Sequence, residues 1–371
     1  MDEILSAALK NFGQDPDTCR LRSVGTGHIH QTYKVEKTIP GQPPLLLQRI
    51  NHHVFRDVEL LMRNLERVTA HIAEKNRQAG KDPAKNGVFF LRAEGGKNWT
   101  GDESAGYWRL CRYIEDHVYH ENAGTPELAL AGGSAVAHFQ SMLADLDPGA
   151  IGDSIPGFHD LELRIGQFEH SLDEAPTGRL KKAANLIQKA REHRPAMTAI
   201  QSLSRKKRLP VRITHNDTKF NNILFDRQGK AVCMIDLDTV MPGYSWFDFA
   251  DSLRTCANTA AEDEVNPEAI HFRLDIYEAF TRGFLAEGSS YLTKEEISLL
   301  PRAPAVFAYM QGLRFLTDFL GGDQYYKTEY PEHNFVRTNA QFTLMDRIVE
   351  KEEQLAVITR QVEDHVRENR S

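Results

Sequence analysis

The residues best suited to chemistry lie in two short polar segments, 215–222 and 236–238. The first carries Asp217 and Asn222 within a His-x-Asp-x-x-x-x-Asn arrangement, and the second begins with Asp236. Phosphoryl transfer needs a carboxylate that accepts the proton of the attacking hydroxyl, and amide and carboxylate oxygens that hold magnesium on the phosphates. Asp217, Asn222 and Asp236 match these three requirements in that order. Magnesium usually keeps water and phosphate oxygens as ligands, so a complete protein cage is not expected.

Short β-rich runs surround these two polar segments. Residues 211–214, 223–225 and 231–237 are predicted strands, and Arg227-Gln228-Gly229 is the turn between the last two. The strands would bring the two polar loops side by side. A polar hairpin loop with capping Asx residues would explain any one of these polar residues alone, whereas their joint spacing favours kinase chemistry.

Three segments carry a resemblance to a known family: HNDTKFNNILFD, IDLDTVMPG and WFDFADSLRT. They resemble the aminoglycoside phosphotransferase and choline kinase superfamily, and within it most of all the N-acetylhexosamine 1-kinases. The resemblance spans most of the chain, with motifs near residues 25, 110, 217, 236 and 314. It implies an α+β, two-lobed, protein-kinase-like fold with a small N-terminal antiparallel sheet lobe and a large, mainly helical C-terminal lobe. It also implies ATP and Mg2+ as cofactors.

Length and composition agree with a two-lobed globular protein. A chain of 371 residues exceeds the usual size of one hydrophobic core, and we predict a nucleotide-binding lobe over 1–116 and a catalytic and substrate-binding lobe over 117–371. The net charge of −7 disfavours nucleic acid as a partner, because phosphate backbones require a basic face. The oligomeric state stays open.

The cellular location is predicted from the absence of signal and membrane segments in the sequence. The N-terminal residues show no basic segment followed by an apolar core, and no apolar run approaches the length of a membrane span. The four cysteines have neither metal-binding nor redox spacing. We therefore expect a cytoplasmic protein that acts on a small molecule and binds no membrane.

Gly25 and Gly27 are candidates for a phosphate-binding loop. They follow a strand predicted over 19–24, and two glycines in a hairpin allow backbone N–H groups to lie over phosphates. A Gly-x-Gly pair alone would be explained as well by a simple hairpin. In the hexosamine kinases that the chain resembles, the matching loop also lies close to the sugar, so His28 is a candidate hydroxyl contact. A solvent-facing turn residue is the alternative for His28.

The strand predicted over 45–50 departs from the kinase pattern. Kinases of this fold place a lysine there to bind the α- and β-phosphates, whereas this chain offers Gln48 and Arg49. Alternation puts Leu47 and Arg49 on one face, and a cleft-facing Arg49 would supply the positive charge through its two-pronged guanidinium. An exposed edge arginine is the alternative.

The rest of the first lobe is predicted from periodicity. Apolar residues three and four apart indicate an amphipathic helix over 57–77, with Glu59 or Glu66 as the partner of Arg49. Residues 88–92 and 107–114 are predicted strands. By resemblance, 108–115 is the hinge that receives adenine on main-chain groups, with Tyr113 as the candidate residue.

The second lobe is predicted to be mostly helical. Asp248 matches the family aspartate that steadies the catalytic loop, and a helix N-cap is its alternative role. Thr293 and Glu296 form a predicted capping box. The expected helices cover 127–142, 161–194, 268–287, 294–300, 304–320 and 336–370.

Arg314 is the main candidate for binding the acceptor. An arginine among apolar neighbours is either paired in the core or lines a cavity. In the sugar kinases that the chain resembles, an arginine and a tyrosine from this region bind the acceptor sugar. Arg314 and Tyr326 match best, although Tyr325 is adjacent, and Asp238 is a further candidate for substrate or metal.

The sequence thus predicts an ATP- and magnesium-dependent kinase for a small-molecule hydroxyl, most of all the anomeric hydroxyl of an N-acetylhexosamine. Choline, ethanolamine, homoserine and aminoglycosides are the alternative acceptors. The missing strand lysine raises a different class, a catalytically silent nucleotide-binding protein. The joint presence of Asp217, Asn222 and Asp236 argues against that class.

Overall fold

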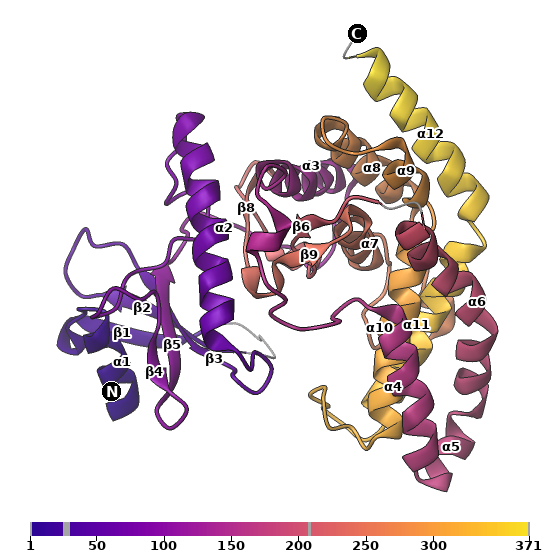
Figure 1. The fold of residues 1–371 in the computed structure, drawn as a ribbon, viewed down its shortest axis with the longest axis horizontal. Helices are drawn as coiled ribbons and strands as arrows, with labels where there is room; N and C mark the ends of the chain where they lie inside the picture. Colours follow the sequence, from indigo (N-terminus) through magenta and orange to yellow (C-terminus); the bar gives the residue numbers. More distant parts are fainter. Residues whose placement is uncertain (1, 25–29, 207–208, 370–371) are drawn as a thin grey trace.

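The computed structural model describes residues 2–24, 30–206 and 209–369 and divides into two unlike parts (Figure 1). A small antiparallel sheet with two helices forms the N-terminal part, and a larger, mainly helical part follows. The predicted α+β, kinase-like arrangement is confirmed. In the part of the chain that is described, no helix is both long and apolar enough to cross a membrane.

The N-terminal sheet has the strand order β1-β2-β3-β5-β4, with every neighbouring pair antiparallel. Alternation along β3 places Leu45 and Leu47 on the face that also carries Leu110 of β5. Helix α1 covers this face with Leu9 and Phe12 and excludes water from it. The elements are α1 (Glu3–Asn11), β1 (Cys19–Ser23), β2 (Gln31–Lys37), β3 (Leu45–Ile50), β4 (Thr100–Asp102) and β5 (Gly106–Arg112).

Helix α2 (Val58–Gln78) joins the sheet to the helical part, as Figure 1 shows. Its N-cap is Asp57, whose carboxylate accepts a hydrogen bond from Leu60 N at 2.8 Å. Asn64 exchanges two hydrogen bonds with the backbone of Gly152, at 2.6 and 3.1 Å. The helix is therefore tied to the loop around residue 152, between the helices Pro126–Met142 and Leu161–Glu174.

The strand predicted over 88–92 is wrong. Phe90 forms an isolated bridge with Cys111, and the edge strand of the sheet is β4 instead. Leu91 N donates to Leu110 O at 2.8 Å, but Gly95 and Gly96 have positive φ and turn the chain away before a ladder can extend.

The larger part contains the predicted helices with some different limits. The helix expected over 336–370 is divided by a turn at Glu350 and Lys351, and the capping box of Thr293 and Glu296 is confirmed. Pro176 limits the backbone of Ala175 and ends the first helix of the 161–194 region. The helices are α3 (Pro126–Met142), α4 (Leu161–Glu174), α5 (Thr177–Lys182), α6 (Ala184–Lys206), α7 (Ser245–Cys256), α8 (Leu274–Gly288), α9 (Lys294–Leu299), α10 (Ala303–Leu320), α11 (His333–Val349) and α12 (Glu352–Glu368).

Two short strand pairs lie between α6 and α7. Strand β6 (Arg212–Thr214) pairs with β9 (Met241–Gly243), and β7 (Ile223–Phe225) pairs with β8 (Ala231–Met234). The predicted third strand ends at Met234, before the acidic residues. Each polar loop thus begins or ends at one of these short strands, which brings the two loops together.

Helices α3 and α8 approach each other closely through two glycines. A Cβ at Gly133 would lie 2.1 Å from Phe280 O, and a Cβ at Gly283 would lie 2.0 Å from Leu130 O. Backbone atoms cannot move aside as a flexible side chain can. Any larger residue must therefore push the two helices apart.

We predict that Gly133→Ala destabilises the protein by about 1–3 kcal/mol, because the added methyl group overpacks the α3–α8 contact. Gly166→Ala in α4 is the matched control: nothing lies within 4 Å of its Cβ position, so stability should rise by about 0.5–1 kcal/mol. Urea unfolding measures both values. Equal effects of the two substitutions would contradict the close contact.

Candidate active site

The loop that carries Asp217 is held in place by Asp248, in the first turn of α7. Its buried carboxylate accepts hydrogen bonds from the backbone N–H groups of His215 at 3.0 Å and Asn216 at 2.7 Å. Gln140 Nε2 donates to the same carboxylate at 2.7 Å. The N-cap of α7 is Tyr244, so the alternative role of Asp248 as an N-cap is wrong. The aspartate steadies the loop instead.

Asn216 fixes the shape of the loop just before Asp217. Its φ of 65° is left-handed, a conformation that asparagine tolerates better than most residues. Its side-chain amide donates to Thr214 O, Thr239 O and Met241 O at 3.1, 2.9 and 3.2 Å. Thr239 Oγ1 in turn donates to His215 O at 2.8 Å. The two polar loops are therefore locked to each other at this point.

The side chain of Asp217 lies among groups that fix its position and keep it ionised. Asn222 Nδ2 donates to its backbone O at 2.9 Å and to its Oδ2 at 3.3 Å, and Lys219 Nζ lies 3.2 Å from its Oδ1. Burial raises the pKa of Asp217, but the charges of Lys219 and His215 outweigh this effect and hold it below the ordinary 3.8. The carboxylate is thus ionised at neutral pH, the state in which it can accept a proton.

Asp236 and Asn222 provide oxygen ligands that fit magnesium. Desolvation in the loop raises the pKa of Asp236, and the negative charges of Asp238 and Asp217 raise it further. The residue is nevertheless exposed to solvent, so the two neighbouring carboxylates are the firmer cause. No described residue donates a hydrogen bond to its side chain. Because Asn222 uses its amide nitrogen on Asp217, its amide oxygen is the atom available to a cation. This combination of an unbalanced carboxylate and an amide oxygen suits a hard divalent cation.

A complete metal cage is not formed by these side chains. Within the described ranges, no group of three or more His, Cys, Asp and Glu residues is arranged to hold a metal ion. Magnesium would therefore take its other ligands from water and phosphate.

Asp238 links the catalytic loops to the N-terminal sheet. Arg109 of β5 donates to both carboxylate oxygens, at 2.8 Å for Oδ2, and His30 Nε2 lies 2.5 Å from Oδ2. Burial raises the pKa of Asp238, but Arg109 and His30 lower it more, so it stays ionised. Oδ2 already accepts from both partners, so a contact of Asp238 with substrate, as predicted, would fall to Oδ1, which accepts from Arg109 alone among the described residues.

The prediction that Arg49 faces the cleft is wrong. Arg49 shares the face of β3 that Leu47 occupies, and its guanidinium lies 5.9 Å from the centre of the Trp108 ring. The face toward the catalytic loops carries Gln48, whose Oε1 accepts a hydrogen bond from Arg109 Nε at 3.0 Å. The arginine on the cleft side of the sheet is therefore Arg109, and its charge is paired with Asp238.

The prediction that Glu59 or Glu66 pairs with Arg49 is also wrong. Glu66 pairs with Arg92 instead. Glu59 lies in the first turn of α2, where its negative charge favours the helix N-terminus.

The remaining nucleotide candidates are placed only in part. Gly25, Gly27 and His28 lie outside the described residues. Tyr113 directly follows β5, and its N–H donates to Pro44 O at 3.1 Å, so this N–H is not available for adenine. The ammonium group of Lys34 lies 4.4 Å from the centre of the Tyr113 ring.

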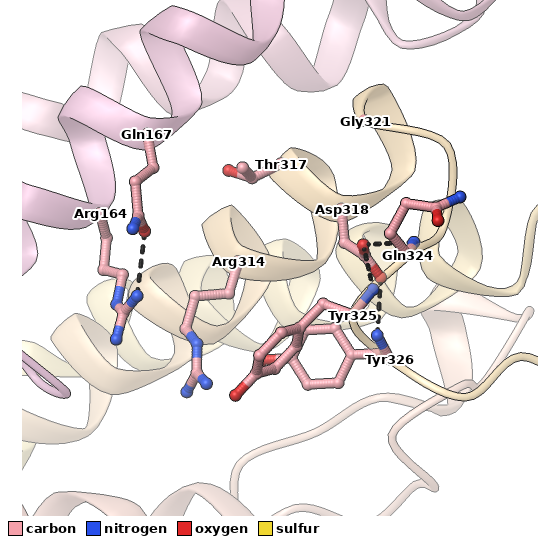
Figure 2. Close-up of a pocket in the computed structure, with 9 residues that line it drawn as sticks. All are labelled: Arg164, Gln167, Arg314, Thr317, Asp318, Gly321, Gln324, Tyr325 and Tyr326. Atoms are coloured by element: carbon pink, nitrogen blue, oxygen red, sulfur yellow. Dashed lines mark hydrogen bonds between the residues drawn. The ribbon is translucent and has the colours of Figure 1, made fainter. Parts of the chain in front are cut away.

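Arg314 and Tyr326 line one cavity of about 280 Å³ (Figure 2). The Arg314 guanidinium lies 5.1 Å from the Phe158 ring and 5.7 Å from the Tyr326 ring. Burial lowers the pKa of Arg314, but Tyr326, Tyr325 and Asp217 outweigh this effect and raise it. Asp217 is therefore near enough to act on Arg314, and the cavity lies beside the catalytic loop. Arg314 thus lines a cavity and is not paired with a carboxylate in the core, among the described residues.

His159 contributes to the site without any sequence signal. Its Nε2 donates to the backbone O of Asn216 at 2.8 Å, and burial lowers its pKa to about 3, so the ring is neutral at neutral pH. It comes from irregular chain before α4, where no periodicity or spacing marks it. His30 and Arg109 were also missed, since their partner Asp238 is distant in sequence.

The comparisons with known proteins agree with this geometry. A sequence model described as "Phosphotransferase enzyme family" matches residues 20–287. An aminoglycoside phosphotransferase from Alicyclobacillus acidocaldarius is similar in fold, with 14% identity, coverage of 97% of this chain and 96% of that one, and a TM-score of 0.59. A choline kinase from Cryptosporidium parvum has 13% identity, coverage of 97% and 96%, and a TM-score of 0.55. An ethanolamine kinase from Plasmodium vivax has 12% identity, coverage of 88% and 82%, and a TM-score of 0.54.

The kinase-like fold and the family match together define the class of protein: the chain is a phosphotransferase. It belongs to the phosphotransferase enzyme family.

We predict that Asp236→Ala abolishes magnesium-dependent turnover and weakens binding of MgATP far more than binding of metal-free ATP. The reason is that the carboxylate would reach the phosphates through the ion. Calorimetric titration with ATP, with and without magnesium, measures the difference. An equal loss for both forms would move the metal role to Asp238 or another residue.

Proposed function

We propose that this phosphotransferase transfers the γ-phosphoryl group of ATP to a hydroxyl group of a small molecule, with magnesium as its cofactor. The observation that supports this most is the convergence of Asp217, Asn222 and Asp236. Asn222 bonds to Asp217, and the charge of Asp217 raises the pKa of Asp236, so the three lie together. A catalytically inactive nucleotide-binding protein would not need an ionised base next to a carboxylate that can bind a metal ion.

In the proposed reaction, Asp217 accepts the proton of the acceptor hydroxyl while the hydroxyl oxygen forms a bond to the γ-phosphorus. The bond from that phosphorus to the β–γ bridging oxygen breaks, and ADP leaves with the electron pair. Magnesium, when bound, would offset the negative charge of the phosphates. Lys219 Nζ, 3.2 Å from Asp217 Oδ1, would help to keep the base ionised before the proton is taken up.

The proposed acceptor is an amino sugar, an N-acetylhexosamine phosphorylated at its anomeric hydroxyl. Arg314 offers several donors of the kind that bind the oxygens of a sugar, and Tyr326 lies beside it. A quaternary ammonium group needs open aromatic faces. The guanidinium of Arg314 already lies over the rings of Phe158 and Tyr326. The cavity is thus better suited to hydroxyl groups than to choline.

We predict that Asp217→Asn lowers kcat by about 100- to 10,000-fold, the usual contribution of a positioned general base, while MgATP still binds. Asp153→Asn, which removes an exposed carboxylate, is the control and should leave kcat unchanged. Steady-state kinetics and nucleotide titration measure the two effects. If turnover of Asp217→Asn stays within about tenfold of the wild type, Asp217 is not the base.

For the acceptor, Arg314→Ala should raise KM for N-acetylhexosamines and leave KM for ATP nearly unchanged, because only the sugar would lose its guanidinium donors. The wild type should also turn over an N-acetylhexosamine well over tenfold faster than choline or kanamycin. Steady-state kinetics of the wild type and of Arg314→Ala with a panel of acceptors test this. Preferred phosphorylation of choline or kanamycin would refute the sugar acceptor and leave the kinase proposal standing.

A further inference from the structure

The cavity beside the catalytic loop contains a second arginine. Figure 2 shows Arg164 of α4 beside Arg314 of α10, with both guanidinium groups at the cavity. Burial lowers the pKa of Arg164, and the positive charge of Arg314 lowers it further. The two groups are therefore close enough to repel each other.

Neither guanidinium is neutralised by a carboxylate in the described part of the chain. Arg164 donates from Nε and Nη2 to Phe158 O at 3.3 and 2.9 Å, and from Nη1 to Gln167 Oε1 at 2.9 Å. Arg314 donates from Nη1 to Gln311 Oε1 at 3.3 Å. All of these acceptors are uncharged. Asp160 and Asp217 act on Arg164 and Arg314 through their charges, but neither forms an ion pair with them in the described part of the chain.

Asp318 is the acidic residue in the cavity wall, and its carboxylate is used elsewhere. Oδ1 accepts hydrogen bonds from the backbone N–H groups of Gln324 and Tyr325, both at 2.8 Å. Oδ2 accepts from Tyr326 N and from Asn334 Nδ2, both at 2.9 Å. Asp318 thus holds the loop that carries the tyrosines and forms no ion pair with either arginine.

Two like charges held together in a half-buried site are unfavourable unless an opposite charge joins them. A neutral sugar would leave this repulsion in place. A carboxylate or phosphate group would relieve it, and the planar forks of two arginines match the geometry of both oxyanions.

We propose that this cavity is a subsite for an anionic substituent, a carboxylate or a phosphate, carried by the acceptor. The proposal deepens the proposed kinase function and rests on it for the reacting hydroxyl. Arg314 lines the cavity and lies near Asp217, whereas Asp217 itself does not line it. The acidic group would therefore lie on the part of the acceptor remote from the hydroxyl that is phosphorylated.

Calorimetry in the presence of MgADP tests the subsite without turnover. The probes are N-acetylglucosamine, N-acetylglucosamine 6-phosphate, glucose and glucuronic acid. We expect at least one anionic probe to bind wild-type protein about tenfold or more tightly than its neutral counterpart, a factor equal to about 1.4 kcal/mol. The preferred probe identifies the group as phosphate or carboxylate.

Two variants remove the preference by different routes. Arg164→Gln should bring anionic and neutral probes to within about twofold, as expected when one charge-assisted bidentate contact is lost. Gln324→Glu places a negative charge in the cavity wall, leaves both arginines in place and should have the same effect. Arg191→Gln is the control: it removes an exposed arginine paired with Glu169, outside the cavity, and should change nothing.

The outcomes separate this proposal from the proposed function. Neutral probes that bind as tightly as both anionic probes, or a preference that survives Arg164→Gln and Gln324→Glu in folded protein, would overturn the subsite. If the anionic preference is present and depends on Arg164, but no sugar is phosphorylated, the subsite stands and the sugar-kinase proposal fails.

Discussion

The geometry of the cleft depends on one buried carboxylate, that of Asp248. It accepts hydrogen bonds from two backbone N–H groups just before Asp217. Thr218 Oγ1 also donates to the backbone O of Asp248 at 2.6 Å. Its loss would leave two buried N–H groups unpaired, at a cost of about 1–3 kcal/mol each. The left-handed Asn216 would then lose the support that orients Asp217. Asp217, the proposed base, is therefore positioned by α7, a helix that follows it in the chain.

The charges around the cleft give a physical reason for the absence of a lysine from β3. Asp217 and Asp238 both lie close enough to Asp236 to raise its pKa. Arg109 and His30 balance Asp238, and Lys219 balances Asp217, which leaves Asp236 unbalanced where a cation is proposed. Gln48 occupies the cleft face of β3 and orients Arg109. A lysine there would add a positive charge next to one already present.

Local patterns predicted the catalytic hairpin but not the contacts between the two parts of the chain. Asp217 and Asn222 lie in one loop, and the spacing of their residue types already indicates their relation. Alternation along β3 gave two equivalent faces, and only the packing of Leu47 against α1 decides that Arg49 points away from the cleft. The Arg109–Asp238 pair joins residues 129 apart, a relation that no sequence period can indicate.

The same division separates phosphoryl transfer from the choice of acceptor. The family match covers residues 20–287, which include Asp217, Asn222 and Asp236, and ends before α10. Arg314 and the loop anchored by Asp318 follow that limit, and they build the cavity wall together with Arg164 of α4. Loops and helix faces of this kind can change without disturbing a hairpin held by its own hydrogen bonds. Membership of the family therefore indicates the type of reaction and not the acceptor. The acceptor depends on the charges in this cavity, where two guanidinium groups disfavour a cation.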